Sequence, residues 1–477
     1  MKTLFRPLVI GLIISLGSLP VNADTLAGIY ELALKNDAKL KAAEATYKAN
    51  LEPEEQAFAR MLPQVTGTAG YSEFDKDVNY DDSSFPGVSG GYDTNQDGDT
   101  TSYGANLQQN IFDLSVWYDF QSSKQTSEQA RAQFAADQQD LIIRVANAYF
   151  DVLRSLDNLQ ATKAEERATK RQLEQTQQRF DVGLIAITDV HEARAVYDDN
   201  VVRRLTDEGN LGTAYEALTV LTGLPHSDLW MLNKDFPVID PNPQSRGAWV
   251  EYALLNNYSL KAAFYAMEAA RENATARKVG HLPTVTGSVS YANDETSGNQ
   301  DASIDAFAAD LGQDSDGTTW SVNLSVPLFA GGGISSQRRQ AYQQYNAALQ
   351  QKIDTQRIVV QNARSSHITT VTDVQRVKAR AQAIISTSSA LDATQAGYEV
   401  GTRNIVDVLQ AQRSLFGSIR DYSNSRYDYV VNLLRLKQAA GILSPQDIYD
   451  ISKWIVSPDS PDASKYQEFL DADSTTP

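Results

Sequence analysis

The chain contains two very long stretches without glycine or proline, from Leu114 to Val182 and from Ile334 to Ala396. Alanine, glutamine and arginine, which favour helices, fill much of both, and apolar residues recur at helical spacing at Leu141, Val145 and Ala148. Continuous helices of this length would run about 95 to 100 Å, far beyond a globular domain. Such helices need partners along their whole length, so the sequence predicts coiled-coil-like bundles. Taken alone, they fit a soluble spectrin-like rod equally well.

The chain also repeats itself at an offset of about 220 residues. Residues 31–43 align with 251–263, and residues 62–71 align with 282–291. Further matches keep the same order: Phe112 with Phe329, Val182-Gly183 with Val400-Gly401, and Asp189-Val190 with Asp407-Val408. We interpret this as an internal duplication in which each half is a large structural unit. Each half reads as helix, strand, acidic loop, strand, very long helix, turn and helix.

These patterns predict a set of boundaries along the chain. The first repeat covers 24–222, with strands at about 63–74 and 101–112 and long helices at about 114–182 and 188–222. The second covers 249–440, with strands at about 283–292 and 318–329 and long helices at about 334–400 and 404–440. Two connecting segments, 223–248 and 441–456, remain, and the Asp-, Ser- and Pro-rich tail 457–477 is expected to be disordered.

The N-terminus has the pattern of a secretory signal peptide covering residues 1–23. Lys2 and Arg6 form a basic region before an apolar run, and Val21-Asn22-Ala23 fits a cleavage site. The alternative, a membrane-anchoring helix, is disfavoured because the run is too short to span a bilayer. Asp24 stands where a lipidated protein needs Cys, so no lipid anchor is expected. No later stretch is long and apolar enough to predict a transmembrane helix.

Four short segments alternate apolar and polar residues with the period of a β-strand. The clearest has Trp320, Val322, Leu324, Val326 and Leu328 opposite Ser321, Asn323 and Ser325. The polar faces carry hydroxyls and amides, which suits a wet lumen, and the apolar faces carry Tyr or Trp near their ends. Each run has about the ten residues that a tilted membrane-spanning strand needs. A soluble antiparallel sheet with one wet face is the alternative.

Four strands cannot close a barrel, and an open edge in lipid leaves backbone groups unpaired at several kcal/mol each. The chain must therefore assemble if these strands enter a membrane. A barrel of eight strands is filled by its own side chains, whereas twelve leave room for a pore. A conduit therefore favours three or more copies.

Composition excludes several classes of function. With 42 Lys and Arg against 60 Asp and Glu, the formal charge is −18, which argues against nucleic acid as a partner. There is no Cys, hence no disulfide framework and no thiolate chemistry, and the four His are isolated. The glycines 331–333 lack the Lys of a phosphate-binding loop. We expect no enzyme activity, no catalytic residue, no metal and no cofactor.

The two inter-strand segments, 73–99 and 292–317, are strongly acidic and are expected to be external loops. Asp93-x-Asn95-x-Asp97-Gly98 resembles the start of a calcium loop, but Gly104 stands where the loop needs its bidentate Glu. A solvated acidic loop is therefore the favoured interpretation.

Residues 175–190 (QTQQRFDVGLIAITDV) and 396–409 (AGYEVGTRNIVDVL) resemble the TolC family of outer-membrane efflux and secretion channels. The resemblance covers almost all of the chain after the signal peptide. It implies a membrane protein of mixed α and β structure. Three copies would form a homotrimeric 12-stranded transmembrane β-barrel, four strands per chain, continuous with a long periplasmic α-helical barrel. The connecting segments 223–248 and 441–456 would form an equatorial belt.

The same resemblance implies a passive exit duct for tripartite drug efflux and type I protein secretion in the outer membrane of a Gram-negative bacterium. A periplasmic adaptor protein and an inner-membrane RND, ABC or MFS transporter would open its periplasmic end. The other partner is outer-membrane lipid. The alternative is a secreted periplasmic helical scaffold or interaction protein without pore activity.

The family resemblance also assigns residues of the periplasmic gate. The closing contacts would join Thr188 and Asp189 on one side to Tyr398 and Arg403 on the other. Arginine offers a fixed fork of donors to a carboxylate, and tyrosine adds a hydroxyl. A further closing contact would involve Gln172. Its partner Glu falls at or near Ile353, which cannot accept a hydrogen bond.

The narrowest point of the pore is expected at Asp407, where a ring of carboxylates would set cation selectivity. The family pattern places a second acidic ring one turn on, but this chain has Gln410 there, which predicts a weaker cation trap. The interhelical turns are expected to be the adaptor docking surface. The turn residues are Gly183, Leu184, Gly401 and Thr402.

Overall fold

The computed structural model describes residues 25–81, 90–458 and 460. The chain divides into two compact units. Unit 1 comprises 1–45, 134–258 and 356–477, and unit 2 comprises 46–133 and 259–355. The predicted signal peptide lies outside the described residues, as does the predicted tail apart from 457, 458 and 460.

The two units do not coincide with the two repeats. Each unit takes segments from both halves of the chain, which differs from the expectation that each half is a structural unit. The reason is strand pairing: β2 (Tyr92–Phe112) from the first repeat pairs with β4 (Thr284–Ala302) from the second along nearly their whole lengths. Neither repeat can therefore satisfy its strands alone.

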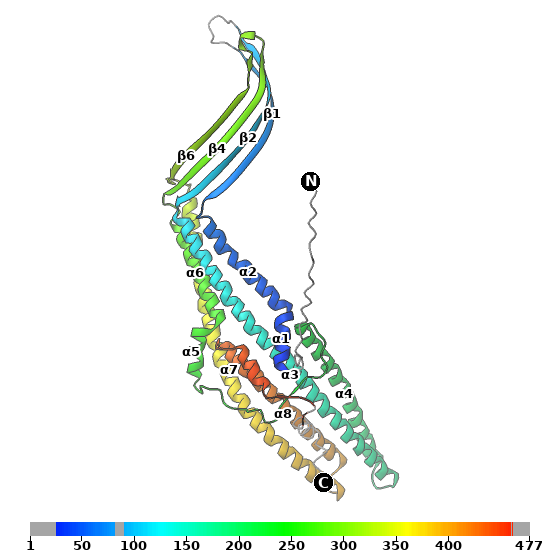
Figure 1. Cartoon of the computed structure of the whole chain (residues 1–477). Coiled ribbons are helices and arrows are strands. Elements are labelled where there is room, and N and C mark those ends of the chain that lie inside the picture. The colour runs from blue at the N-terminus through cyan, green and yellow to red at the C-terminus, as the bar shows by residue number, and fades with distance from the viewer. Residues whose placement is uncertain (1–24, 82–89, 459, 461–477) are drawn as a thin grey trace, which may run out of the picture. The chain divides into compact units, whose positions relative to one another are not determined.

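Unit 2 contains an antiparallel sheet of four long strands that lie side by side (Figure 1). They are β1 (Gln64–Tyr80), β2 (Tyr92–Phe112), β4 (Thr284–Ala302) and β6 (Gln313–Ser325), in the spatial order β1-β2-β4-β6. The 3-10 turn η1 (Asp305–Phe307) and the short strand β5 (Ala309–Asp310) follow β4. The outer edges of β1 and β6 carry no partner strand among the described residues.

The strands extend further into the acidic segments than the sequence predicted, whereas β6 ends at Ser325, before the predicted end at about 329. The acidic segments 73–99 and 292–317 were expected to be loops, but β1 continues to Tyr80, β2 begins at Tyr92 and β4 continues to Ala302. The ladder pairs acidic and amide residues directly, for example Asp75 with Asp97 and Asn95 with Asp301. A search for alternating apolar residues misses such strands, because neither of their faces is apolar. Their backbone groups nevertheless pair with the neighbouring strand. Residues 93–98, which resemble a calcium loop, lie within β2.

Four helices contribute to unit 2: α2 (Ala38–Ala59), α3 (Leu114–Asp181), α6 (Tyr258–Lys278) and α7 (Gly333–Glu399). Unit 2 contains parts of α2, α3 and α7, and all of α6 except its first residue. Within this unit the Phe58 and Phe120 rings are 5.8 Å apart, and the Ser122 hydroxyl donates to the Ala269 carbonyl at 2.8 Å. Each helix leads directly into or out of a long strand. Among the described helices, none is both long and apolar enough to cross a membrane.

Unit 1 is built from the other parts of α2, α3 and α7 together with five further helices. These are α1 (Leu26–Asn36), α4 (Ile187–Thr222), α5 (Arg246–Asn256), α8 (Ile405–Ala439) and α9 (Pro445–Ser452). The two connecting segments meet here, because β3 (Met231–Leu232) pairs with β7 (Ile455–Val456). Buried Ile29, Tyr149 and Val430 belong to one apolar core that also includes Leu232 and Ile455. The core thus holds the connecting segments against the long helices.

Candidate functional site

Two turns of identical construction join the long helices of unit 1. Gly183 and Gly401 end α3 and α7 with φ angles of 79° and 77°, the left-handed region that favours glycine. The N–H of Leu184 donates to the Arg179 carbonyl at 2.9 Å, and that of Thr402 to the Gly397 carbonyl at 2.8 Å. These are the bonds of a Schellman helix end, formed at matching positions in both repeats.

The second turn leads into α8, whose N-terminus has a capping box formed by Asn404 and Asp407. The Asn404 side-chain oxygen accepts from the Asp407 N–H at 2.8 Å, and the Asp407 carboxylate accepts from the Asn404 N–H at 3.3 Å. This reciprocal capping box holds a carboxylate, 38% exposed, at the positive end of the α8 dipole. Sequence analysis missed this role, although Asn-x-x-Asp before an apolar run could have indicated it. Gln410 lies one turn further along α8 and is exposed.

Tyr398 lies in a small apolar cluster where four helices meet. Its ring is buried with Ala193 of α4 and with Ile405, Val408 and Leu409 of α8, and Leu173 of α3 packs against the cluster. The Arg179 guanidinium lies 4.8 Å from the ring centroid, within cation–π range. The Tyr398 hydroxyl is buried without a hydrogen-bond partner among the described residues. We call this set the gate cluster.

Arg403 stays close to its own turn. A guanidinium nitrogen lies 3.9 Å from the Asp407 carboxylate. The aliphatic part of the side chain covers Gly397, where an added Cβ would lie 2.9 Å from the Arg403 Cγ. The Thr188 hydroxyl lies 3.4 Å from the neighbouring Asp189 carboxylate. Within the described chain, no hydrogen bond or ion pair joins Thr188 or Asp189 to Tyr398 or Arg403.

Gln172, the remaining predicted gate residue, is buried on α3. Its side chain is 5% exposed, and its amide nitrogen has no hydrogen-bond partner among the described residues. A buried polar group without a partner costs free energy, so this amide and the Tyr398 hydroxyl are two unsatisfied groups in the same unit. The structure thus brings Tyr398 together with helices α4 and α8. Thr188 contacts only its neighbour Asp189 among the predicted gate residues, and the Gln172 amide nitrogen has no hydrogen bond to any of them within the described chain.

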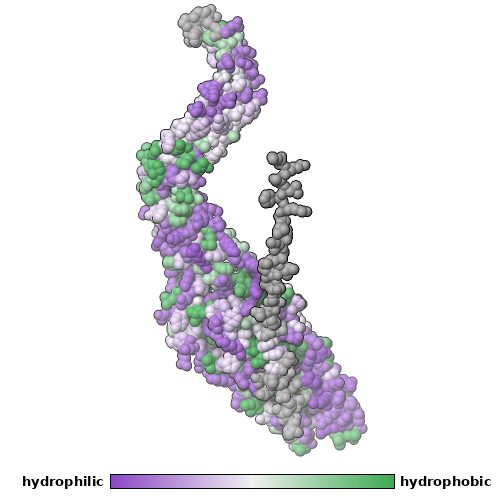
Figure 2. Space-filling model, viewed as in Figure 1, coloured by the Kyte–Doolittle hydropathy of each residue, from purple (hydrophilic) through white to green (hydrophobic). Residues whose placement is uncertain are grey.

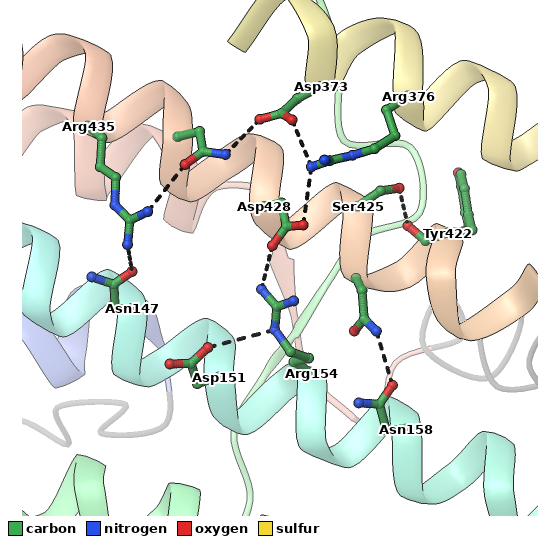
Figure 3. A network of polar contacts seen from close by, with 12 residues as sticks. Asn147, Asp151, Arg154, Asn158, Asp373, Arg376, Tyr422, Ser425, Asp428 and Arg435 are labelled. Carbon is green, nitrogen blue, oxygen red and sulfur yellow. Dashed lines mark hydrogen bonds and ion pairs between the residues drawn. The ribbon is translucent and has the colours of Figure 1, made fainter. Parts of the chain in front are cut away.

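A network of charged and amide groups joins α3, α7 and α8 further along the same helices (Figure 3). Asp428 of α8 contacts Arg154 of α3 at 2.7 Å and Arg376 of α7 at 3.2 Å. Arg376 also contacts Asp373 at 2.7 Å, and the Asn432 amide donates to Asp373 at 2.7 Å. Burial raises the pKa of Asp373 despite these two partners. Any separation of α8 from α3 and α7 must break these contacts.

Glu165 is a buried carboxylate on α3 with only distant cations. It is 1% exposed, and its oxygens lie 3.5 Å from Arg420 of α8 and 3.9 Å from Arg203 of α4. Burial raises the pKa of Glu165 above its ordinary value, and the nearby arginines only partly oppose this. The folded protein therefore disfavours the ionised carboxylate relative to the unfolded chain.

Replacing Glu165 with Gln should raise the unfolding temperature of the purified protein at pH 7.5. Because the folded pKa is raised, the ionised group lowers stability at neutral pH, and that cost disappears as the pH falls through the folded pKa towards the unfolded value of about 4.3. The difference between variant and wild type should therefore shrink on acidification, as measured by thermal unfolding at several pH values. Glu166 is the control, because Glu166→Gln removes a direct 2.7 Å ion pair with Arg204 and should not stabilise. A stabilisation that is independent of pH would contradict the argument.

Comparison with known proteins places this geometry in context. A family model described as "Outer membrane efflux protein" matches residues 29–224 and 249–442. The outer membrane protein TolC of Vibrio cholerae is 38% identical over 448 residues, which cover 94% of this chain and 97% of that protein. The alkaline protease secretion protein AprF of Pseudomonas aeruginosa is 24% identical, covering 91% of this chain and 87% of that protein.

A solved structure shares the fold. The outer membrane protein VceC from Vibrio cholerae superposes with a TM-score of 0.70 at 22% identity, covering 87% of this chain and 96% of that one.

Proposed function

Since this chain belongs to the outer membrane efflux protein family, we propose that three copies assemble into a duct whose periplasmic end is a gate. The chain is an outer-membrane exit duct for drug efflux and type I protein secretion. The family match and the relatives confirm the family resemblance and the location predicted from the sequence. The relatives are channel and secretion proteins, and we propose that this chain performs no chemistry itself and that a partner transporter supplies the energy.

The sheet of unit 2 supports the proposal that several copies of the chain form one barrel. It ends in two strands, β1 and β6, whose outer edges lack partners among the described residues. Within lipid each unpaired backbone group costs several kcal/mol, and pairing β1 of one copy with β6 of the next removes that cost. Three copies give twelve strands, enough for a water-filled pore.

The exposed side chains of β6 support a lipid-facing wall. Trp320, Val322 and Leu324 are 76%, 72% and 67% exposed, and they alternate with Ser321 and Asn323. A soluble protein rarely exposes such a row of large apolar residues without a partner. Lipid on one side and water on the other accounts for the alternation.

The gate cluster supports closure at the periplasmic end. Tyr398 packs α7 against α4 and α8, and the polar network around Asp428 holds α8 to α3 and α7. We propose that opening separates α7 and α8 from α3 and α4, that contacts of Thr188 and Asp189 with Tyr398 and Arg403 hold the closed state, and that Gln172 takes part in a separate closing contact. Each such bond to a charged group contributes about 1.5–3 kcal/mol, so threefold repetition keeps the gate closed while a partner can still open it.

The two turns present the surface for that partner. Val182, Leu184 and Val400 at the turns are 71%, 73% and 76% exposed. Together with Gly183, Gly401 and Thr402 they form matching apolar tips in both repeats. We propose that a periplasmic adaptor protein binds these tips and couples them to an inner-membrane RND, ABC or MFS transporter.

The purified protein should conduct ions in planar bilayers, and trivalent cations added on the periplasmic side should block it with the affinity of a single carboxylate ring. We propose Asp407 as that ring, with its capping bond holding each carboxylate in place. Gln410→Asp adds a second ring one turn on and should deepen the block about tenfold or more, because charge count dominates multivalent binding in a pore. Asp407→Asn should abolish the block.

Bilayers that stay silent, with a protein that remains a single copy without detergent, would instead support the periplasmic scaffold. Block of equal affinity in wild type and Gln410→Asp would contradict the assignment of Asp407 and Gln410 to the constriction while leaving the duct itself intact.

A further inference from the structure

Unit 2 contains a pocket of about 510 Å³ between α6 and α7 that is rich in cations. Its lining includes Arg271 and Lys278 of α6 and Arg338, Arg339, Tyr342 and Tyr345 of α7. Arg271 and Lys278 are seven residues apart and so lie on one helix face. A concentration of positive charge is unexpected in a chain with a formal charge of −18.

Three of the four cations lack a counter-ion among the described residues. Arg271 already contacts Glu268 at 2.6 Å and Glu272 at 3.2 Å. Across the part of the chain that the structure describes, no carboxylate lies within ion-pair distance of Lys278, Arg338 or Arg339. Uncompensated cations around one pocket favour a ligand that carries negative charge.

The pocket lies next to the sheet. Lys278 is the last residue of α6, and β4 begins at Thr284. Arg338 and Arg339 lie in the first two turns of α7, which follows β6. Between β6 and α7, Leu328 and Phe329 are 92% and 90% exposed, and Figure 2 shows apolar side chains gathered where the sheet meets these helices. This is the pattern of a membrane–water boundary, where apolar, tyrosine and basic side chains follow one another.

We propose that this pocket binds the phosphate of an anionic phospholipid of the periplasmic leaflet. The proposal rests on the proposed function, which places the sheet in the outer membrane. Arg338, Arg339 and Lys278 would contact the headgroup phosphate, and Tyr342, 55% exposed beside Tyr345, would lie along the glycerol region. Bound lipid would anchor the start of α7, the helix that ends at the gate cluster.

A second copy is the competing source of negative charge, because Glu52, Glu54 and Glu55 of α2 are also without cation partners among the described residues. The strand order disfavours it. A neighbouring β1 would pair with β6 on the side away from β4, which brings the neighbouring α2 to the side of α7 away from α6. The pocket lies between α6 and α7, so a lipid reaches it more directly.

The test is native mass spectrometry of the assembled full-length protein in detergent, titrated with phosphatidylglycerol and, separately, with phosphatidylcholine. Wild type should retain phosphatidylglycerol preferentially. Lys278→Gln with Arg338→Gln and Arg339→Gln should lose about fivefold in affinity for each cation removed, equivalent to about 1 kcal/mol each. The matched control removes one Lys and two Arg further along α7: Lys352→Gln, Arg357→Gln and Arg364→Gln should leave retention unchanged.

Three outcomes would overturn the proposal. Equal retention by wild type and the pocket variant excludes the site. Inorganic phosphate that competes with phosphatidylglycerol at equal concentration assigns the pocket to free phosphate. If the pocket variant and the variant Glu52→Gln, Glu54→Gln, Glu55→Gln both lower the dissociation temperature of the assembly while lipid retention is unchanged, the occupant is a second copy. The pocket variant should keep the bilayer conductance of the wild type. Unchanged conductance shows that the duct is intact, so each of these outcomes then contradicts the lipid site and not the proposed function.

Discussion

Replacing Arg403 with Ser should increase the conductance of the closed channel in planar bilayers, with the open fraction rising about tenfold or more. The Arg403 guanidinium lies 3.9 Å from Asp407, and its stem covers Gly397, so the side chain is held at the turn with donors free for a second copy. Loss of about 1.5–3 kcal/mol of charged hydrogen bonding per chain, repeated around the pore, would shift a closed gate strongly towards opening.

Tyr398→Phe separates the role of the hydroxyl from that of the ring. The hydroxyl is buried without a partner among the described residues, and the ring is buried in the gate cluster. Phenylalanine preserves the packing of the ring, so increased leakage would report on the hydroxyl alone. Arg364→Ser, an exposed change on the same helix α7, is the control and should leave the trace unchanged. An unchanged trace for Arg403→Ser would remove Arg403 from the gate.

Val322→Arg should prevent assembly in the outer membrane, whereas Asn323→Arg should not. Val322 lies on the apolar face of β6 opposite Gly287, and Asn323 lies on the polar face opposite Thr286. Arg or Lys on the lipid face costs about 2–4 kcal/mol near the bilayer midplane, and the cost recurs in every copy. Outer-membrane fractionation with detection of heat-sensitive oligomers measures the effect.

Asn323→Arg is the matched control, because its side chain would point into water. It should assemble normally and lower cation conductance by adding positive charge to the lumen. If both variants assemble equally well, the alternation in β6 does not separate lipid from water, and the sheet is not a barrel wall. If both fail, β6 tolerates no charge on either face, which argues for packing against protein on both sides.

Several features of the site were open to prediction from local sequence. Gly183 and Gly401 mark the helix ends because their φ angles of 79° and 77° are costly for any other residue. The capping role of Asp407 was also readable from Asn404 three residues earlier, although it was not predicted. In both cases the physical cause lies within one turn of the chain.

Other features depend on residues far apart in sequence. Burial of Tyr398 requires Ala193, some 200 residues away, and Asp428 is held between Arg154 and Arg376. The extension of β1 and β4 through acidic residues depends on partner strands, because each backbone group there is satisfied by a neighbour and not by an apolar face. The cationic pocket also escaped prediction, since Lys278 and Arg338 meet only when α6 and α7 pack.

By itself the sequence determined the duplication, the long helices, the glycine turns and the alternating strands, because each is a periodic or local property of the chain. Only the tertiary structure decided that the repeats share one sheet and one apolar core, how far the strands run, and which gate residues lie together. The physical reason is that hydrogen-bond pairing and burial join segments of both halves, and no local pattern records which distant partner satisfies a given group.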